Sequence, residues 1–244
     1  MANQTAVWNR ADLHLHTTYS DGSAAPAELL AHAARNDLRV IAVTDHDEIE
    51  GAFEAHKLGP QFGVDVIIGE EVSTAHGHLL GLFLHTRIPP GLDARETVAR
   101  IHEQGGLAIA PHPFDASVPS LGRRLGAAGL QALPLDGIEV FNASIFWPWR
   151  AANRMAQSLA ETMNLAQIGG SDAHALCAVD SGRTWFRGQR AADVFTAIRQ
   201  GATRADGNYL TRSNHLRQVA DMVRSMGVGS FTRWVMQGAE PASA

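Results

Sequence analysis

Six short segments of this chain carry histidines or carboxylates at spacings that suit metal ligands. In the first segment, HLH, His14 and His16 are two residues apart, so both side chains leave the same face of an extended strand. Two imidazoles on one face can hold one ion, but two histidines that only hydrogen-bond to their surroundings would show the same spacing. This pair alone leaves both interpretations open.

The continuation of the first segment to Asp21 and the other five segments add carboxylates and further imidazoles. Asp21 in YSDG is also a common type of turn residue, whereas three titratable groups in a row follow the apolar run 40–43 in TDHD. The remaining candidates are Glu70 and Glu71 in GEEVS, His78 in GHLLGL, His112 in APHP, and Asp172 and His174 in GSDAH. Buried charges without partners are costly. The number of candidate ligands also exceeds the number that one ion needs. Two or three bound ions are the simplest common partner.

The elements that must position these groups alternate along the chain. Expected strands cover residues 11–16, 39–44, 64–68, 78–84, 107–110, 137–141 and 166–169, and expected helices cover 26–35, a segment capped by Asp93, 148–163, 191–200 and 212–225. Strands separated by helices predict parallel pairing and an α/β fold. Seven strands favour a closed or nearly closed barrel, with an open doubly wound sheet as the alternative. In either, the carboxyl ends of the strands build the active site.

Composition limits the possible partners. Hydrophobic residues make up 45% and charged residues 18% of the 244, as in soluble globular proteins, and no apolar run reaches the length needed to span a bilayer. The N-terminal residues lack the apolar core of a signal peptide, and a single cysteine, Cys177, predicts a reducing cytoplasm. The net charge of −5 disfavours broad adhesion to nucleic acid or membrane but allows a small phosphorylated substrate.

Taken in order, the motifs HLHTTYSDG, VTDHD, GEEVS, GHLLGL, APHP and GSDAH resemble those of the polymerase and histidinol phosphatase (PHP) family of metal-dependent phosphoesterases. They run from about residue 12 to residue 174. The resemblance implies a distorted seven-stranded (β/α) barrel, similar to a TIM barrel, with a trinuclear metal site. We expect one such domain over residues 1–237, including a C-terminal helical region, and a flexible tail at 238–244. Amidohydrolase-type barrels also begin with HxH, but the only lysine, Lys57, lies away from the expected strand ends, which removes their lysine-bridged form.

The resemblance also implies a set of ligands. One ion would be held by His14, His16, Glu71 and Asp172, a second by Glu71, His78 and His112, and a third by Asp21, His46 and His174. The family pattern favours Glu71 over Glu70. We expect two or three ions of zinc, manganese or iron. The nucleophile would be metal-bound hydroxide rather than a side chain, and activity should fall below about pH 6 as the ligand histidines protonate.

Three further residues are candidates for support or substrate binding. Asp45 flanks a proposed ligand and is expected to support it; Asn142 follows the sixth expected strand and Arg183 could bind a phosphate, although a cap or surface role would suit each. Trp147 and Trp149 flank a proline and could form a platform for a base or simply pack at a helix start.

The expected function is therefore hydrolysis of a phosphate monoester of a small metabolite or nucleotide. The alternatives are a nuclease that cleaves oligonucleotide phosphodiesters and a catalytically silent, metal-stabilised module, although the latter would be expected to have lost ligands. The sequence does not specify the substrate or the oligomeric state.

Overall fold

Nine strands form one mixed sheet in the order β7-β6-β5-β4-β3-β2-β1-β8-β9. A computed structural model describes residues 7–227 and 232, so the expected tail at 238–244 lies outside the described residues. The strands are β1 (Trp8–Asp12), β2 (Val40–Val43), β3 (Asp65–Thr74), β4 (Gly77–Leu82), β5 (Leu107–Ala110), β6 (Gly137–Asn142), β7 (Ala166–Gly170), β8 (Gly182–Arg187) and β9 (Arg204–Gly207). The helices are α1 (Pro26–Arg35), α2 (Glu50–Phe62), α3 (Ala94–Glu103), α4 (Leu121–Gln131), α5 (Ala151–Met163), α6 (Ala191–Arg199) and α7 (Arg212–Met226).

The sheet is less regular than the alternating pattern predicted. Strands β1, β2 and β3 pair in parallel, as do β5, β6 and β7, but β4 is antiparallel to both of its neighbours. The chain turns straight back from β3 to β4 at Ala75 and His76, where the Thr74 hydroxyl donates to the Gly77 carbonyl at 2.6 Å. Gly77 has φ +120° and abuts the backbone at Ser120, so a side chain would not fit there. The expectation of parallel pairing throughout was therefore wrong at β4.

The curved sheet closes where β7 meets β8 and the segment after β1. The Thr184 side chain accepts a hydrogen bond from the Gly169 N–H at 2.9 Å and donates to the Gly169 carbonyl at 2.8 Å. A Cβ on Gly182 would lie 1.9 Å from the Gly170 carbonyl oxygen, so glycine permits this close approach. Leu15 forms a parallel bridge with Ala173 beyond the strand ends. Together these contacts produce the nearly closed, distorted α/β barrel that the sequence predicted. Strands β8 and β9 were not foreseen.

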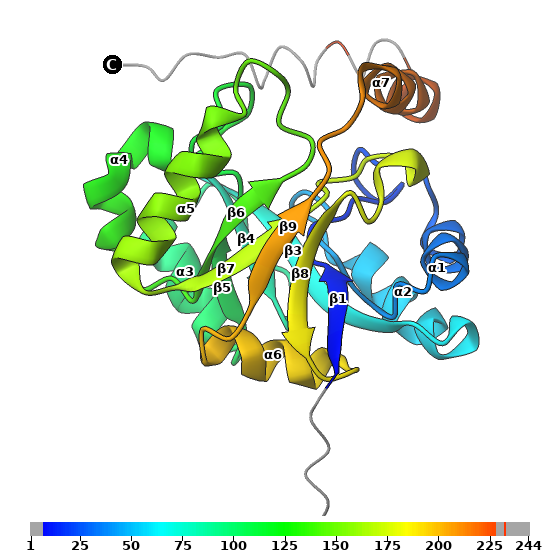
Figure 1. Ribbon diagram of the computed structural model, residues 1–244, viewed down its shortest axis with the longest axis horizontal. Helices are drawn as coiled ribbons and strands as arrows, with labels where there is room; N and C mark the ends of the chain where they lie inside the picture. Colours follow the sequence, from blue (N-terminus) through cyan, green and yellow to red (C-terminus); the bar gives the residue numbers. More distant parts are fainter. Residues whose placement is uncertain (1–6, 228–231, 233–244) are drawn as a thin grey trace, which may run out of the picture.

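Helices pack on the outside of the barrel, with α1 and α2 on one side and α3, α4 and α5 on the other (Figure 1). Helix α1 has the predicted bounds, with Pro26 in its first turn, Glu28 capping the Ala25 N–H and Leu29 and Leu30 buried. The Asp93 cap of α3 is also confirmed, since its side chain accepts from the Arg95 N–H. No helix among the described residues is long and apolar enough to cross a membrane.

The interior of the barrel holds its own apolar cluster, separate from the layer under the helices. Residues such as Leu13, Val40, Ala42 and Ile109 form it, and α6 covers its lower end (Figure 1). Strand β1 ends at Asp12, before the HLH motif, so the prediction of a strand through His16 was too long. Leu13 packs in the interior with Ala11, whereas Leu15 packs under the helices, so the strand alternation breaks after Leu13. The upper end of the barrel remains for polar groups.

Candidate metal centre

The nine residues expected to bind metal gather around one carboxylate at the upper end of the barrel. Oxygen Oε2 of Glu71 lies 3.0 Å from His14 Nε2, 3.3 Å from His16 Nε2 and 3.4 Å from His46 Nδ1. Its other oxygen, Oε1, lies 3.0 Å from His78 Nδ1 and 3.0 Å from His112 Nε2. Glu71 thus joins five histidines that come from four separate segments of the chain.

Two aspartates complete the cluster. Asp172 Oδ1 lies 3.3 Å from His16 Nε2 and 3.6 Å from His14 Nε2. Asp21 Oδ2 lies 3.2 Å from His174 Nε2 and 3.6 Å from His46 Nε2. Three sets of side chains offer ligand atoms within 4.8 Å of one another: His14, His16, Glu71 and Asp172; His16, Asp21, His46 and His174; and His46, Glu71 and His78. The first set is the one expected for the first ion. The second set is the one expected for the third ion with His16 added, and the third set has His46 where His112 was expected.

The electrostatics of this cluster are those of a cation site. Burial alone would raise the pKa values of Glu71, Asp172 and Asp21, but the surrounding histidines lower all three below their usual range. Burial opposes charge on His16, yet the carboxylates of Asp172 and Glu71, each 3.3 Å from its Nε2, raise its pKa to about 10. In contrast, burial lowers the pKa of His46 to about 4. The three carboxylates therefore stay ionised beside the buried imidazoles, an arrangement that favours a bound cation.

Several buried polar atoms of the cluster also lack a hydrogen-bond partner. Among the described residues, both ring nitrogens of His16, Oδ2 of Asp21 and Nδ1 of His78 are buried and lack a partner in hydrogen-bonding geometry. Such orphaned polar atoms are costly, and imidazole with carboxylate is the ligand set preferred by zinc and related ions. The donor set therefore fits divalent metal ions.

Access to the cluster is limited to one side. The His14 and His16 side chains are fully buried, whereas those of His46, Asp172 and His78 are 21%, 13% and 12% exposed. A substrate can therefore approach over His46 and His78 but not from the barrel interior.

Glu139 is a functional candidate that the sequence did not suggest. Its fully buried carboxylate accepts from His14 Nδ1 at 3.1 Å, from the His112 N–H at 2.8 Å and from Asn142 Nδ2 at 3.0 Å. It thus holds two candidate ligands from behind and directs Nε2 of His14 toward Glu71 and Asp172. A single charged residue in the apolar strand GIEVFN was the signal that could have found it.

Asp45 and Asn142 both support the cluster. Asp45 accepts from the Thr17 N–H at 2.7 Å and from the hydroxyls of Thr17 and Ser20 at 2.7 and 2.6 Å, which fixes the loop leading to Asp21. The Asn142 amide donates to Asp172 Oδ2 at 3.1 Å as well as to Glu139. Both residues therefore act on the proposed ligands through hydrogen bonds.

Arg183, Glu70 and His76 lie outside the cluster. The guanidinium of Arg183 pairs with Asp180 at 3.0 Å and approaches Asp206, so the structure does not place it as a free phosphate-binding group. Glu70 points to the opposite face from Glu71 and accepts from the Ile88 N–H at 2.8 Å. His76 lies 3.6 Å from Asp93. The preference for Glu71 and His78 is consistent with this geometry.

Two candidate ligands adopt strained backbone conformations. His112 has φ +28° and Asp172 has φ +53°, both in the left-handed region. The His112 N–H is held by Glu139, and the Asp172 N–H donates to the His14 carbonyl at 3.0 Å. Strain of this kind concentrates at functional sites, where surrounding bonds enforce it.

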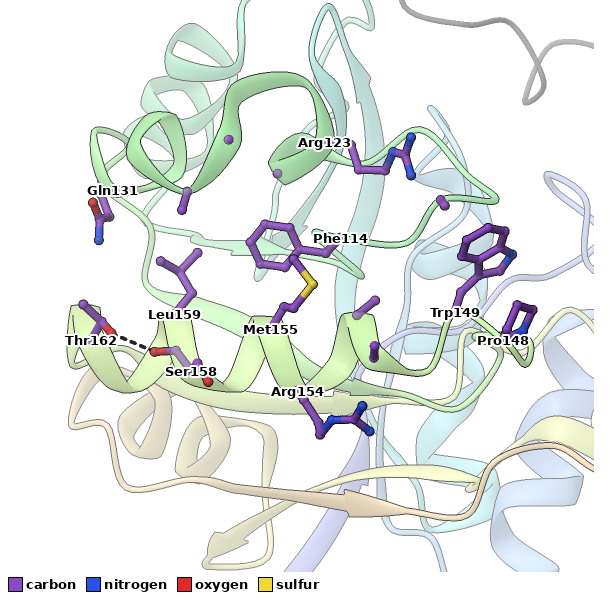
Figure 2. A pocket seen from close by; sticks show the side chains of 16 residues that line it. Phe114, Arg123, Gln131, Pro148, Trp149, Arg154, Met155, Ser158, Leu159 and Thr162 are labelled. Carbon is purple, nitrogen blue, oxygen red and sulfur yellow. Dashed lines mark hydrogen bonds between the residues drawn. The ribbon is translucent and has the colours of Figure 1, made fainter.

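A large groove lies elsewhere on the molecule. It has a volume of about 1060 Å³ and runs between α4 and α5 on the outside of the barrel, where Phe114, Met155 and Leu159 project into it (Figure 2). None of the nine candidate ligands lines it, so it is not the metal centre.

Comparison with known proteins identifies the family. The PHP domain profile matches residues 12–143, more than half of the chain. The chain belongs to the PHP domain family. The PHP-associated profile matches residues 150–203, and the protein is accordingly a metal-dependent phosphoesterase, a hydrolase. This PHP protein is 45% identical over 145 residues to an uncharacterised protein of Methanocaldococcus jannaschii, covering 55% of this chain and 82% of the relative.

A solved structure shares the fold. A two-domain protein from Bacteroides vulgatus, containing a predicted PHP-like metal-dependent phosphoesterase, superposes with a TM-score of 0.69 and 20% identity over 91% of this chain and 71% of the other. Two curated relatives match shorter segments. A 5′-3′ exoribonuclease of Haemophilus influenzae is 32% identical over 113 residues, 45% of this chain and 41% of that protein. A 3′,5′-nucleoside bisphosphate phosphatase of Chromobacterium violaceum is 37% identical over 75 residues, 29% of this chain and 26% of that protein.

Proposed function

We propose that this PHP protein hydrolyses phosphate monoesters of a small phosphorylated metabolite or nucleotide at a site for two or three divalent ions of zinc, manganese or iron. The observation that carries the proposal is the position of Glu71, whose two oxygens face five imidazoles at 3.0–3.4 Å. One carboxylate among so many imidazoles is suited to bridging two ions.

The proposed ligands overlap the three geometric sets but also include His112, which lies 3.0 Å from Glu71. One ion would take His14, His16, Glu71 and Asp172; a second would take Glu71, His78 and His112; a third would take Asp21, His46 and His174. Bound divalent ions would supply an activated water at neutral pH and neutralise the oxygens of the phosphate. No serine or cysteine nucleophile is part of the proposal.

The chain's own residues would prepare this site. Glu139 holds His14 with Nε2 free to bind, and Asn142 orients Asp172 by donating to its Oδ2. The buried walls exclude bulk water from the fully buried His14 and His16, which strengthens electrostatic interactions with a phosphate.

The limited access favours a terminal phosphate. Among the nine candidate ligands, the most exposed side chains are those of His46, Asp172, His78 and His174, and none is more than 21% exposed. A phosphomonoester presents a small dianionic group that can enter such an opening, whereas an internal phosphodiester must bring a chain on both sides. The partial similarity to a nucleoside bisphosphate phosphatase supports the same choice.

A nuclease remains the second candidate because one partial relative is a 5′-3′ exoribonuclease. An enzyme that acts at a strand end also needs only a terminal group to reach the cluster. A catalytically silent module is disfavoured because all nine expected ligand positions are occupied and lie together.

Metal content and substrate range test the proposal together. Purified protein should contain two or three ions per chain by mass spectrometry and should hydrolyse p-nitrophenyl phosphate faster than its diester or 5′-phosphorylated oligonucleotides. Faster cleavage of the oligonucleotides would favour the nuclease, and bound metal without turnover of any substrate would favour the silent module.

A matched pair of histidine variants tests the site. His112→Ala should lower the metal content and should reduce the rate of hydrolysis at least 100-fold while the fold is retained, since it removes a proposed ligand 3.0 Å from Glu71. The control His76→Ala removes a histidine outside the cluster, and its turnover should match the wild type. Equal turnover in both variants would contradict the proposed second ion.

Two broader expectations accompany this proposal. We propose that residues 1–237 act as one domain, because the PHP-associated segment supplies β7 and β8 to the same sheet as the PHP segment. A cytoplasmic location, suggested by the single cysteine, stays a prediction.

A further inference from the structure

A second, smaller pocket lies between the segment 146–150 and the start of helix α7. It has a volume of about 310 Å³, near the lower end of the range for small-molecule sites, and we call it the rim pocket. It is lined by Phe146, Trp147, Arg150, Leu210, Thr211, Arg212 and His215. None of these residues is acidic, and two are arginines, in a chain whose net charge is −5.

The two arginines of the rim pocket lack an anionic partner. Within the described part of the chain, neither Arg150 nor Arg212 forms an ion pair with a carboxylate. The Arg150 guanidinium lies 4.1 Å from the centre of the Tyr209 ring, which holds it in place, while its Nε is buried without a hydrogen-bond acceptor. A buried donor of this kind is costly unless something supplies the missing acceptor.

His215 adds a second buried nitrogen without a partner. Its Nε2 is buried and unbonded within residues 7–227, and its ring packs edge-on against Phe146 at 5.2 Å. Burial and the neighbouring Arg150 lower the pKa of His215, so its ring is neutral and the positive charge of the pocket belongs to the arginines. The exposed Trp147 completes a wall suited to a planar or apolar group.

The rim pocket is tied to the metal centre on two sides. On one side, the Ser144 hydroxyl donates to the Asp172 carbonyl at 3.0 Å, and Phe146 follows only two residues later, within about 7 Å of chain. On the other side, the His174 N–H donates to the Gln218 side chain at 3.2 Å, and His215 lies one turn of α7 earlier, a rise of about 5 Å. One small molecule can therefore reach both sites.

Most of the pocket comes from segments outside the two family matches. Phe146 and Trp147 lie between the two matched ranges, and Leu210–His215 lie beyond both. Helix α7, which supplies Arg212 and His215, stands above the barrel at the end of the sheet where the metal centre lies (Figure 1).

We propose that the rim pocket binds a second anionic group of the substrate, a phosphate or a carboxylate, while the scissile phosphate lies at the metal centre. This inference rests on the proposed function and names its substrate class: small phosphate esters with two separated negative groups. Arg150 and Arg212 would donate charge-assisted hydrogen bonds to the second group, and Phe146 and Trp147 would contact the part that links the two.

Selectivity between matched substrates tests this proposal. The ratio of kcat/KM for adenosine 3′,5′-bisphosphate over adenosine 5′-monophosphate should exceed one in the wild type and fall at least about tenfold in Arg150→Gln and in Arg212→Gln. A third substrate, 3-phosphoglycerate, tests a carboxylate in the second position. The control Arg217→Gln, on the same helix but outside the pocket, should keep the wild-type ratio. No preference in the wild type, or an unchanged ratio in both pocket variants, would overturn the proposal.

A binding measurement separates this inference from the proposed function. If no phosphate ester is hydrolysed, the function fails, and the pocket is then judged by quenching of tryptophan fluorescence with the same nucleotides. Tighter binding of the bisphosphate in the wild type than in Arg150→Gln, with the signal reduced in Trp147→Phe, would support the pocket. Equal affinities in wild type and Arg150→Gln would refute it.

Discussion

Replacing Glu139 by glutamine changes one atom but disrupts the support of two candidate metal ligands. The carboxylate accepts three hydrogen bonds, one from His14 on Oε1 and two, from the His112 N–H and the Asn142 amide, on Oε2. Glutamine has a single acceptor oxygen, and its amide nitrogen must face a donor on one side or the other.

Either orientation of the glutamine is unfavourable. If its nitrogen faces His14, the imidazole must move its proton to Nε2, the atom that faces Glu71 at 3.0 Å, and that nitrogen can then no longer bind metal. If its nitrogen instead takes the place of Oε2, the His112 N–H and the Asn142 amide both face a donor and lose their acceptor. Each unsatisfied buried donor costs about 1–3 kcal/mol, so metal affinity should fall about 10- to 100-fold.

The assay is competition for zinc with a fluorescent chelator at neutral pH, with circular dichroism to confirm that the fold is retained. Glu96→Gln is a matched control, because Glu96 is exposed and pairs only with Arg100 at 2.9 Å on the surface of α3. If Glu139→Gln binds every ion with an affinity within twofold of the wild type, Glu139 does not position His14 and the reasoning is refuted.

Three further predictions concern the metals and the groups around them. Removal of the ions with a chelator should abolish hydrolysis and lower the Tm by about 5–10 °C, since saturation at 100 times Kd stabilises the fold by about 2.7 kcal/mol; an unchanged Tm would argue against structural binding. Burial raises the pKa of Glu70 to about 7, so the native state retains a proton that the unfolded state releases above pH 4.5. The stability of metal-depleted protein should therefore fall by up to about 3 kcal/mol from pH 4.5 to above 7 relative to Glu70→Gln, and parallel profiles in denaturant titrations would contradict this. Asp45→Asn should weaken one ion about tenfold by loosening the bonds to Thr17 and Ser20, and metal content at limiting zinc measures the change.

The candidate site could be predicted from the sequence because its residues follow apolar segments that end at the same edge of the barrel. His14 and His16, Glu71 and Asp172 come together at 3.0–3.6 Å as their strand-end positions suggested. Local patterns also determined the bounds of α1, where a proline, a capping glutamate and buried leucines agree. These features depend on residues that are close in sequence or on the common direction of strands.

Other features depend on contacts that no local pattern contains. The β3–β4 turn at Ala75 and His76 lacks the Asn-Gly signal of a tight hairpin, so β4 was expected to run parallel. Strand β8 buries Gly182, Thr184 and Phe186 at alternate positions, but its role depends on pairing with β1, far away in the chain. The support role of Glu139 likewise requires His14, 125 residues earlier, and could not be read from its own strand.

The closing bridge between Leu15 and Ala173 has a consequence for how the enzyme acquires its metals during synthesis. A ribosome adding about 5–20 residues per second makes His14 and His16 about 10–30 s before Asp172 and His174 leave the peptidyl-transferase centre. Throughout that interval the HLH pair is available to ions while its carboxylate partners from the last motif do not yet exist. Under the proposed ligand sets, the first and third ions therefore cannot be fully coordinated until translation has passed His174, so their binding coincides with closure of the barrel at the Leu15–Ala173 bridge.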